Sequence, residues 1–177
     1  MILWVRRLTI SVVVFLAAIQ IFQPAKTNPR TDPGMEIYRS APMEVAVASV
    51  LGQSCNDCHS NHTIWPWYSR VAPISWLVIS DVNRGRRALN FSEWNSYAPD
   101  TQRRYLTEIC KEASDGEMPV FSYRLMHSQA NLTKNKIIVV CRWAQSTNQT
   151  SASSTISSNA CRREVLWAEQ QTIRRKR

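Results

Sequence analysis

The feature that most constrains this chain is the pentapeptide Cys55-Asn56-Asp57-Cys58-His59. Two thiols separated by two residues can each form a thioether with one vinyl group of the same porphyrin, and the histidine that follows can bind the iron from one side. The C-x-x-C-H spacing is typical of covalent c-type haem attachment. The sequence therefore predicts one haem c per chain, held by Cys55 and Cys58, with His59 as the proximal iron ligand.

A second iron ligand is predicted from the Gly-Glu-Met-Pro sequence of residues 116–119. Thioether sulfur is a soft, neutral ligand that favours ferrous iron and raises the potential. Glycine and proline favour an irregular backbone here, so the methionine between them lies in a loop rather than in a helix. We predict Met118 as the distal ligand. Met126, His127 and an iron that is open or otherwise ligated at this position are the alternatives.

Three other uses of the pentapeptide compete with haem attachment. A structural zinc site would take Cys55, Cys58, His59 and His62, but four ligands within eight residues are cramped for one tetrahedral ion. A thiol–disulfide oxidoreductase would need a βαβ pattern, which the sequence lacks. A simple disulfide between the two cysteines would leave the adjacent histidine unexplained.

The N-terminus predicts an export element. Arg6 and Arg7 precede an apolar run from Leu8 to Phe22, and a basic flank of this kind stays on the cytoplasmic side. The run is short for a full membrane span, and the residues that follow, 23–25, lack the small-residue spacing of a cleavage site. We therefore favour an uncleaved inner-membrane anchor with the rest of the chain in the periplasm. A cleaved periplasmic form is the alternative.

The chain divides into five predicted segments. Apolar residues at helical spacing predict helices that begin near residue 42 and cover 101–113 and 133–144, and no strand pair is evident. The sequence thus predicts an all-α protein with a cytochrome c-like helical domain. The segments are a membrane segment (1–25), a proline-rich spacer (26–41), the domain (42–144), a Ser/Thr/Asn-rich linker (145–160) and a basic tail (161–177).

Composition limits the partners of the chain. The formal net charge is +9, but residues 1–26 carry +3 and residues 161–177 carry +4, which leaves +2 for the chain between them. A nearly neutral body argues against nucleic-acid binding. The chain has seven tryptophans, and such aromatic density suits either a core or a wall around a large flat ligand. We predict that Trp65, Trp67, Tyr68 and Trp76 contribute to a haem wall.

Several short motifs accompany the pentapeptide: the run from Cys55 to Ser69, residues 72–76 (Ala-Pro-Ile-Ser-Trp), Asp81-Val82 with Gly85, residues 89–94, residues 116–119, and Tyr123, His127, Ala130, Leu132 and Trp143. Together, between about Met43 and Ala144, they resemble the bacterial haem-binding domain family of small monohaem c-type cytochrome proteins. The resemblance implies a cytochrome c-like fold, covalent haem on both motif cysteines and proximal His59, with Met118 as distal ligand by analogy with cytochromes c.

The other three cysteines, Cys110, Cys141 and Cys161, and the tail after Ala144 lie outside the family pattern. Cys110 and Cys141 fall on two predicted helices that can pack together, so they form either a disulfide or buried free thiols.

The predicted function is a membrane-tethered electron carrier rather than an enzyme, with a redox partner that the sequence does not identify. A haem-based sensor or ligand-binding module with an exchangeable distal position is the alternative. A peroxidase-like catalyst is disfavoured, because a single C-x-x-C-H is present and no distal acid–base pair is visible from spacing.

Overall fold

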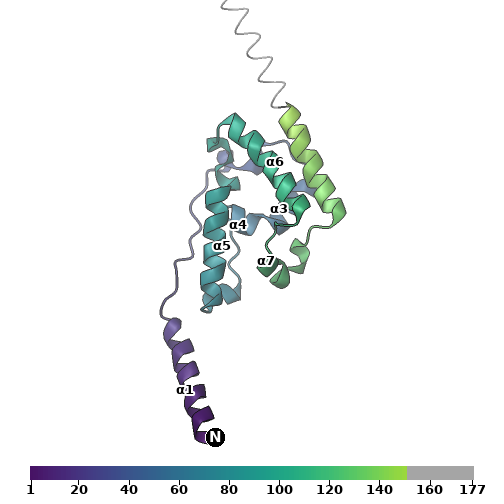
Figure 1. Cartoon of the computed structure of the whole chain (residues 1–177). Helices are drawn as coiled ribbons and strands as arrows, with labels where there is room; N and C mark the ends of the chain where they lie inside the picture. Colours follow the sequence, from purple (N-terminus) through teal and green to yellow (C-terminus); the bar gives the residue numbers. More distant parts are fainter. Residues whose placement is uncertain (151–177) are drawn as a thin grey trace, which may run out of the picture.

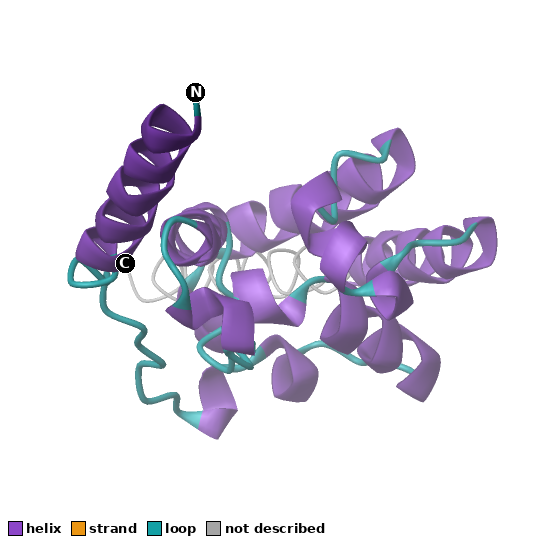
Figure 2. Ribbon diagram, turned by 90° about the horizontal axis from the view of Figure 1, so that it is seen from below, coloured by secondary structure: helices purple, strands orange, loops and turns teal. Residues whose placement is uncertain are grey.

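The computed structural model describes residues 1–150, and every regular element in that range is helical (Figures 1 and 2). This confirms the all-α prediction. The predictions for residues 151–177, including Cys161 and the basic tail, lie outside the described residues. The α-helices are α1 (Ile2–Ile19), α2 (Ile37–Ser40), α3 (Val45–Ser54), α4 (Asn56–His59), α5 (Ile74–Ala88), α6 (Pro99–Asp115) and α7 (Phe121–Met126). Short 3-10 helices are η1 (Pro33–Met35), η2 (Trp67–Arg70), η3 (Phe91–Ser96) and η4 (Ser128–Ala130), and residues 134–150 form a further helix.

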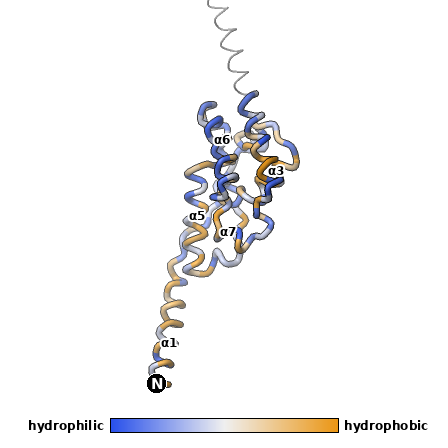
Figure 3. The backbone as a smooth tube through the Cα atoms, turned by 45° about the vertical axis from the view of Figure 1, so that its right-hand side comes forward, coloured by the Kyte–Doolittle hydropathy of each residue, from blue (hydrophilic) through white to orange (hydrophobic). Residues whose placement is uncertain are grey.

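Helix α1 projects from the body of the molecule (Figure 1). It has 18 residues with a mean hydropathy of 2.0, and none of them is buried. Most of its backbone has the orange of hydrophobic residues in Figure 3. At a rise of about 1.5 Å per residue it is about 27 Å long, close to the hydrocarbon thickness of a bilayer. Helix α1 is therefore long and apolar enough to cross a membrane, as an export signal also can be.

Residues 26–41 are not the spacer that the sequence predicts. Ile37 and Ala41 are buried in the hydrophobic core, and Asn28 donates a hydrogen bond to the Thr63 carbonyl (2.9 Å). The Arg86 guanidinium adds bonds to the Thr27 carbonyl (2.7 Å) and to the Asn28 side chain (3.0 Å). Prolines correctly indicated an irregular chain here. Periodicity could not reveal that this irregular chain packs on the domain, because each of its helical segments is too short to show a repeat.

The core forms where α3, α6 and the last helix meet. Val47, Val50 and Leu51 of α3 are buried there, as their helical spacing predicts, and they pack with Leu106 and Trp143. Helix α6 covers the predicted 101–113 and extends two residues beyond it at each end. It ends at Gly116, whose φ of 76° places it in the left-handed conformation that favours glycine. The end of α6 thus leads directly into residues 116–119.

The last helix continues past the predicted boundary at residue 144. Residues 145–150 are helical, and the Asn148 side chain donates to the Arg103 carbonyl (3.2 Å) and to the Thr107 hydroxyl (3.3 Å) of α6. These polar contacts hold the helix where its composition predicts a linker. Cys110 and Cys141 form a disulfide between the same two helices, with Cα atoms 4.7 Å apart. The structure thereby decides between the two states that the sequence left open for this pair.

Candidate functional site

The pentapeptide lines a cavity of about 550 Å³. Cys55, Cys58 and His59 contribute to its wall, together with Met118 from the loop after α6. Most of the remaining lining is apolar and comes from α3, α5, η3, α6 and the last helix, and from the segments just after α5, just after α6 and just before the last helix: Val50, Leu51, Ala88, Leu89, Phe91, Ile109, Ala113, Pro119, Val120, Leu132 and Val140. The fold therefore brings all four predicted attachment and ligand residues to one cavity.

Both motif cysteines are free thiols that are partly buried. Burial raises the pKa of Cys55 to about 12 and that of Cys58 to about 11, and neighbouring negative charge adds to each effect. Reactive oxidoreductase thiols need the opposite, a lowered pKa that supplies thiolate at neutral pH. These thiols are therefore poorly suited to disulfide exchange, whereas a neutral thioether suits their environment.

His59 is oriented by the backbone of the segment after α5. Its Nδ1 lies 3.1 Å from the Leu89 carbonyl oxygen, which can only accept a hydrogen bond and so assigns the proton to Nδ1. This tautomer leaves the lone pair of Nε2 free for a metal. Burial lowers the pKa of His59 and favours the neutral imidazole. A hydrogen bond from the ring nitrogen that does not bind the metal is the usual support for a metal-binding histidine.

A glycine on α5 allows the pentapeptide to pack closely against that helix. A Cβ at Gly85 would lie 2.4 Å from the carbonyl oxygen of Cys58 and 3.1 Å from its Cβ. Both distances are shorter than van der Waals contact, so a larger residue at this position would displace one of the two segments. Gly85 therefore acts as a positioning residue, which local sequence patterns gave no means of identifying.

The two residues between the cysteines are also held in place. Asp57 accepts hydrogen bonds from the Ile64 backbone N–H (2.9 Å) and from the Tyr123 hydroxyl (2.8 Å). Asn56 accepts one from the Tyr38 hydroxyl (3.3 Å). Burial, and next the bond to Asp57, raise the pKa of Tyr123, which keeps its hydroxyl protonated as the donor. The sequence analysis missed Asp57, because its partners lie 7 and 66 residues away.

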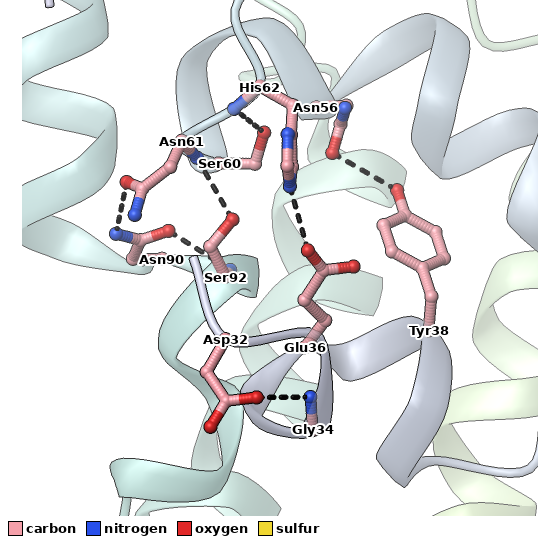
Figure 4. A network of polar contacts seen from close by, with 10 residues as sticks. All are labelled: Asp32, Gly34, Glu36, Tyr38, Asn56, Ser60, Asn61, His62, Asn90 and Ser92. Carbon is pink, nitrogen blue, oxygen red and sulfur yellow. Dashed lines mark hydrogen bonds and ion pairs between the residues drawn. The ribbon is translucent and has the colours of Figure 1, made fainter. Parts of the chain in front are cut away.

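A polar network holds the segment after His59 (Figure 4). The Asn61 backbone N–H donates to the Ser92 hydroxyl (3.0 Å), and Asn90 donates to the Asn61 side-chain oxygen (3.0 Å). His62 pairs with Glu36 at 2.7 Å. The first two contacts fasten this segment to the start of η3, and the third fastens it to the residue before α2.

The zinc alternative finds no support in this arrangement. His62 is exposed and bound to Glu36, away from the cavity lined by the two thiols and His59. Within residues 1–150, no group of three or more His, Cys, Asp and Glu side chains is placed to hold a metal ion. The four-ligand site that the spacing allowed is therefore not assembled.

The four aromatic residues predicted as a haem wall do not line the larger cavity. Trp65 and Trp76 line neither of the two cavities described here, and their indole N–H groups donate to Asn28 (3.2 Å) and to the Phe22 carbonyl (2.7 Å). Trp67 and Tyr68 instead line a second cavity of about 180 Å³, which shares Cys58 and Tyr123 with the larger one. Aliphatic side chains and Phe91 form the larger wall, because helices distant in sequence, rather than the aromatic run itself, close around it.

Of the three candidate distal ligands, only Met118 lines the larger cavity. Met118 is 37% exposed. His127 is 2.6 Å from the Tyr68 hydroxyl through Nε2, and its ring stacks on Tyr123 with centroids 4.3 Å apart. Met126 lines the second cavity. The placement of these side chains favours Met118 over its two competitors.

Comparison with known protein families identifies a cofactor-binding domain, which is consistent with the cavity described above. A family model described as a haem-binding domain matches residues 14–146, more than half of the chain. The match begins within α1 and includes residues 26–41, which agrees with the packing of that segment on the body. No curated protein and no solved structure matches the chain.

Proposed function

Because this chain belongs to the haem-binding domain family, we propose that it is a membrane-tethered monohaem c-type cytochrome that transfers single electrons. One observation carries the proposal: both thiols of the C-x-x-C-H motif, His59 and Met118 line the same apolar cavity of about 550 Å³. This volume is within the range of cofactor sites, and the donor set consists of two thiols, one imidazole and one thioether. The residues present therefore fit a haem.

In this proposal each residue has a separate role. Cys55 and Cys58 would hold the haem through thioether bonds, and His59, whose ring the Leu89 carbonyl orients, would bind the iron through Nε2. Met118 would be the second protein ligand. The haem, when bound, supplies an iron centre that gains and loses one electron. With both protein ligands in place the iron would keep no position for a substrate, which favours a carrier over a catalyst.

The apolar wall has its own effect on this chemistry. Side chains such as Leu51, Phe91 and Val140 exclude water from the cavity, and a low local dielectric disfavours the more highly charged ferric state. Methionine ligation acts in the same direction. We therefore expect a potential well above that of a haem with two histidine ligands.

Two independent features support the proposed location. Helix α1 is able to cross a membrane, and the Cys110–Cys141 disulfide is typical of proteins in oxidising compartments. Both support a domain on the periplasmic side, attached through α1. A chain whose α1 is cleaved after export would be the soluble form of the same protein.

The test is a visible spectrum of the chain produced with a c-type maturation system. We expect a pyridine haemochrome spectrum of c type, and haem that remains with the protein after acid–acetone extraction. Cys55→Ser with Cys58→Ser should abolish retention, whereas Cys110→Ser with Cys141→Ser should preserve it. A colourless protein, or haem fully extracted from the wild type, would overturn the proposal.

One observation favours a second function, that of a haem-based ligand sensor. Met118 is partly exposed, and it lies in a loop rather than in a helix, so a small ligand could replace it. Carbon monoxide distinguishes the two functions. A carrier with a stable methionine ligand leaves the reduced spectrum unchanged in carbon monoxide, whereas a sensor shows a shifted Soret band.

A further inference from the structure

Five exposed apolar side chains surround the second cavity of about 180 Å³. We call this group the apolar end; its members are Ile64, Trp67, Ile74, Leu77 and Met126. Ile64 is 78% exposed and Trp67 is 73% exposed. Exposed apolar groups scattered over a surface need no explanation, but a cluster that lines one cavity marks an interaction surface.

The chain that leaves α1 is fastened next to the apolar end. The Gln20 side chain accepts from the Ala72 backbone N–H (2.9 Å) and donates to its carbonyl (3.1 Å). The Trp76 indole N–H donates to the Phe22 carbonyl (2.7 Å). Ala72 and Trp76 flank Ile74, which belongs to the apolar end. In Figure 1, α1 meets the body at the end formed by the start of α5 and by α7.

We propose that the apolar end rests on the surface of the same bilayer that α1 crosses. The inference relies on the membrane tethering proposed above. The 18 residues of α1 make a helix of about 27 Å, so when its N-terminal end is at the cytoplasmic face of a hydrocarbon core of about 30 Å, Gln20 lies at the other face. Arg6 and Arg7 then lie within the first two turns of α1, from which their long side chains can reach the cytoplasmic headgroups. The paired bonds from Gln20 to Ala72 then hold the start of α5 at that same interface.

The side chains at this end suit a lipid interface better than a soluble partner. Trp67 and Trp76 combine an apolar ring with an indole N–H, the composition enriched at the boundary between headgroups and hydrocarbon. Two bases accompany them: Arg70 is exposed at the end of η2, and Lys26 donates to the Ser69 carbonyl (3.3 Å). Basic side chains beside an apolar surface attract anionic headgroups.

Docking would set the position of the larger cavity. The two cavities share Cys58, Asp81, Val120 and Tyr123, so the apolar end and the attachment site are neighbours. A docked body would hold Cys55 and Cys58 just above the membrane surface in one orientation. An undocked body would be oriented only by its hydrogen bonds to Gln20 and Phe22.

The experiment measures the solvent exposure of the apolar end in the full chain. The protein is reconstituted at one copy per nanodisc in phosphatidylcholine with phosphatidylglycerol, and hydroxyl-radical footprinting gives the oxidation rates of Trp67 and Met126. We expect both rates to be several-fold lower than in the Ile74→Asp/Leu77→Asp variant, whose charges oppose contact with lipid. Both substitutions are at exposed positions, and circular dichroism verifies that the variant folds.

The matched control is Ile138→Asp, which places a carboxylate at a 52% exposed isoleucine of the last helix and should leave the rates at Trp67 and Met126 low. Equal rates in wild type and Ile74→Asp/Leu77→Asp would overturn the docking. One copy per disc excludes protection by a second copy. Failure of the proposed function is read separately in the same sample, as the absence of covalent haem or the elution of the chain apart from the discs.

Discussion

The two sides of the larger cavity are held in different ways. On the side of residues 55–59, Asn56 and Asp57 accept hydrogen bonds, Cys58 packs on Gly85, and His59 is fixed by a carbonyl. The other side of the cavity is formed by the methionine loop, residues 116–119. There Met118 is partly exposed, and its backbone N–H donates to the Glu112 carbonyl (3.2 Å). Helix α7, which follows, has no buried residue.

This difference separates two tasks within one site. In the proposed haem site, covalent attachment and proximal ligation would require atoms held in one geometry, and Asn56, Asp57, Cys58 and His59 are each supported by another part of the fold. A proposed distal ligand would tolerate a segment that adapts, because a single bond from sulfur to iron would then position it. We therefore expect substitutions around residues 55–59 to reduce stability, and substitutions in the methionine loop to alter the spectrum and potential instead.

The largest loss of stability is expected from removing the disulfide between the last helix and α6, the helix that leads into the methionine loop. The Cys110–Cys141 disulfide closes a loop with a sequence separation of 31 residues, so Cys110→Ser with Cys141→Ser should lower the free energy of unfolding by about 3–4 kcal/mol. Denaturant unfolding with and without reductant measures it. In the double variant, reductant should have no further effect, and a wild type insensitive to reductant would contradict the prediction.

Gly85→Ala should cost nearly as much. The added Cβ would lie 2.4 Å from the Cys58 carbonyl, and relieving such overpacking typically costs about 1–3 kcal/mol, here expected near the upper end because the contact is with backbone. Gly52→Ala on α3 is the matched control, since a Cβ there has no neighbour within 4 Å. That control should be neutral or slightly stabilising. Equal stability of the two variants would show that α5 and α4 are not tightly apposed.

Asp57→Ala should have an intermediate effect. It leaves the Ile64 N–H and the Tyr123 hydroxyl without their acceptor, for a loss of about 2 kcal/mol in unfolding free energy. Tyr123→Phe removes only the second bond and should cost about 1 kcal/mol. Comparing the two by chemical denaturation separates the contribution of the Ile64 bond. An Asp57→Ala variant as stable as wild type would show that the support of the pentapeptide lies elsewhere.

Met118→Ala should have the smallest effect on stability, below about 1 kcal/mol, because the side chain is partly exposed and lies in a loop. Its effect on the proposed haem should be large: a lower potential, and carbon monoxide binding in the reduced state. Potentiometric titration and the Soret band report both. Met126→Ala is the control, since Met126 lines only the second cavity. An unchanged spectrum in Met118→Ala would exclude Met118 as a ligand.

How far the sequence predicted the site depended on the distance between interacting residues. The pentapeptide could be interpreted from the sequence alone, because its two thiols and its imidazole lie within five consecutive residues. Tyr123 and Gly85 were named only as parts of a family resemblance. Tyr123 contacts Asp57, which is 66 residues away in the chain, and Gly85 contacts Cys58 where α5 packs closely against α4. Trp65, Trp67, Tyr68 and Trp76 lie outside the lining of the larger cavity, and aromatic density in the sequence could not indicate which cavity each ring faces.

The sequence by itself determined the presence of the C-x-x-C-H motif, the helical character of the body, and the apolar N-terminal helix. Each of these depends on residues close together in the chain, where spacing and helical periodicity apply. Only the tertiary structure decided that Ile37 belongs to the core, that Cys110 and Cys141 are joined, and that aliphatic side chains line the larger cavity. Those outcomes arise from packing between distant segments, which is set by shape and buried area over the whole domain rather than by local pattern.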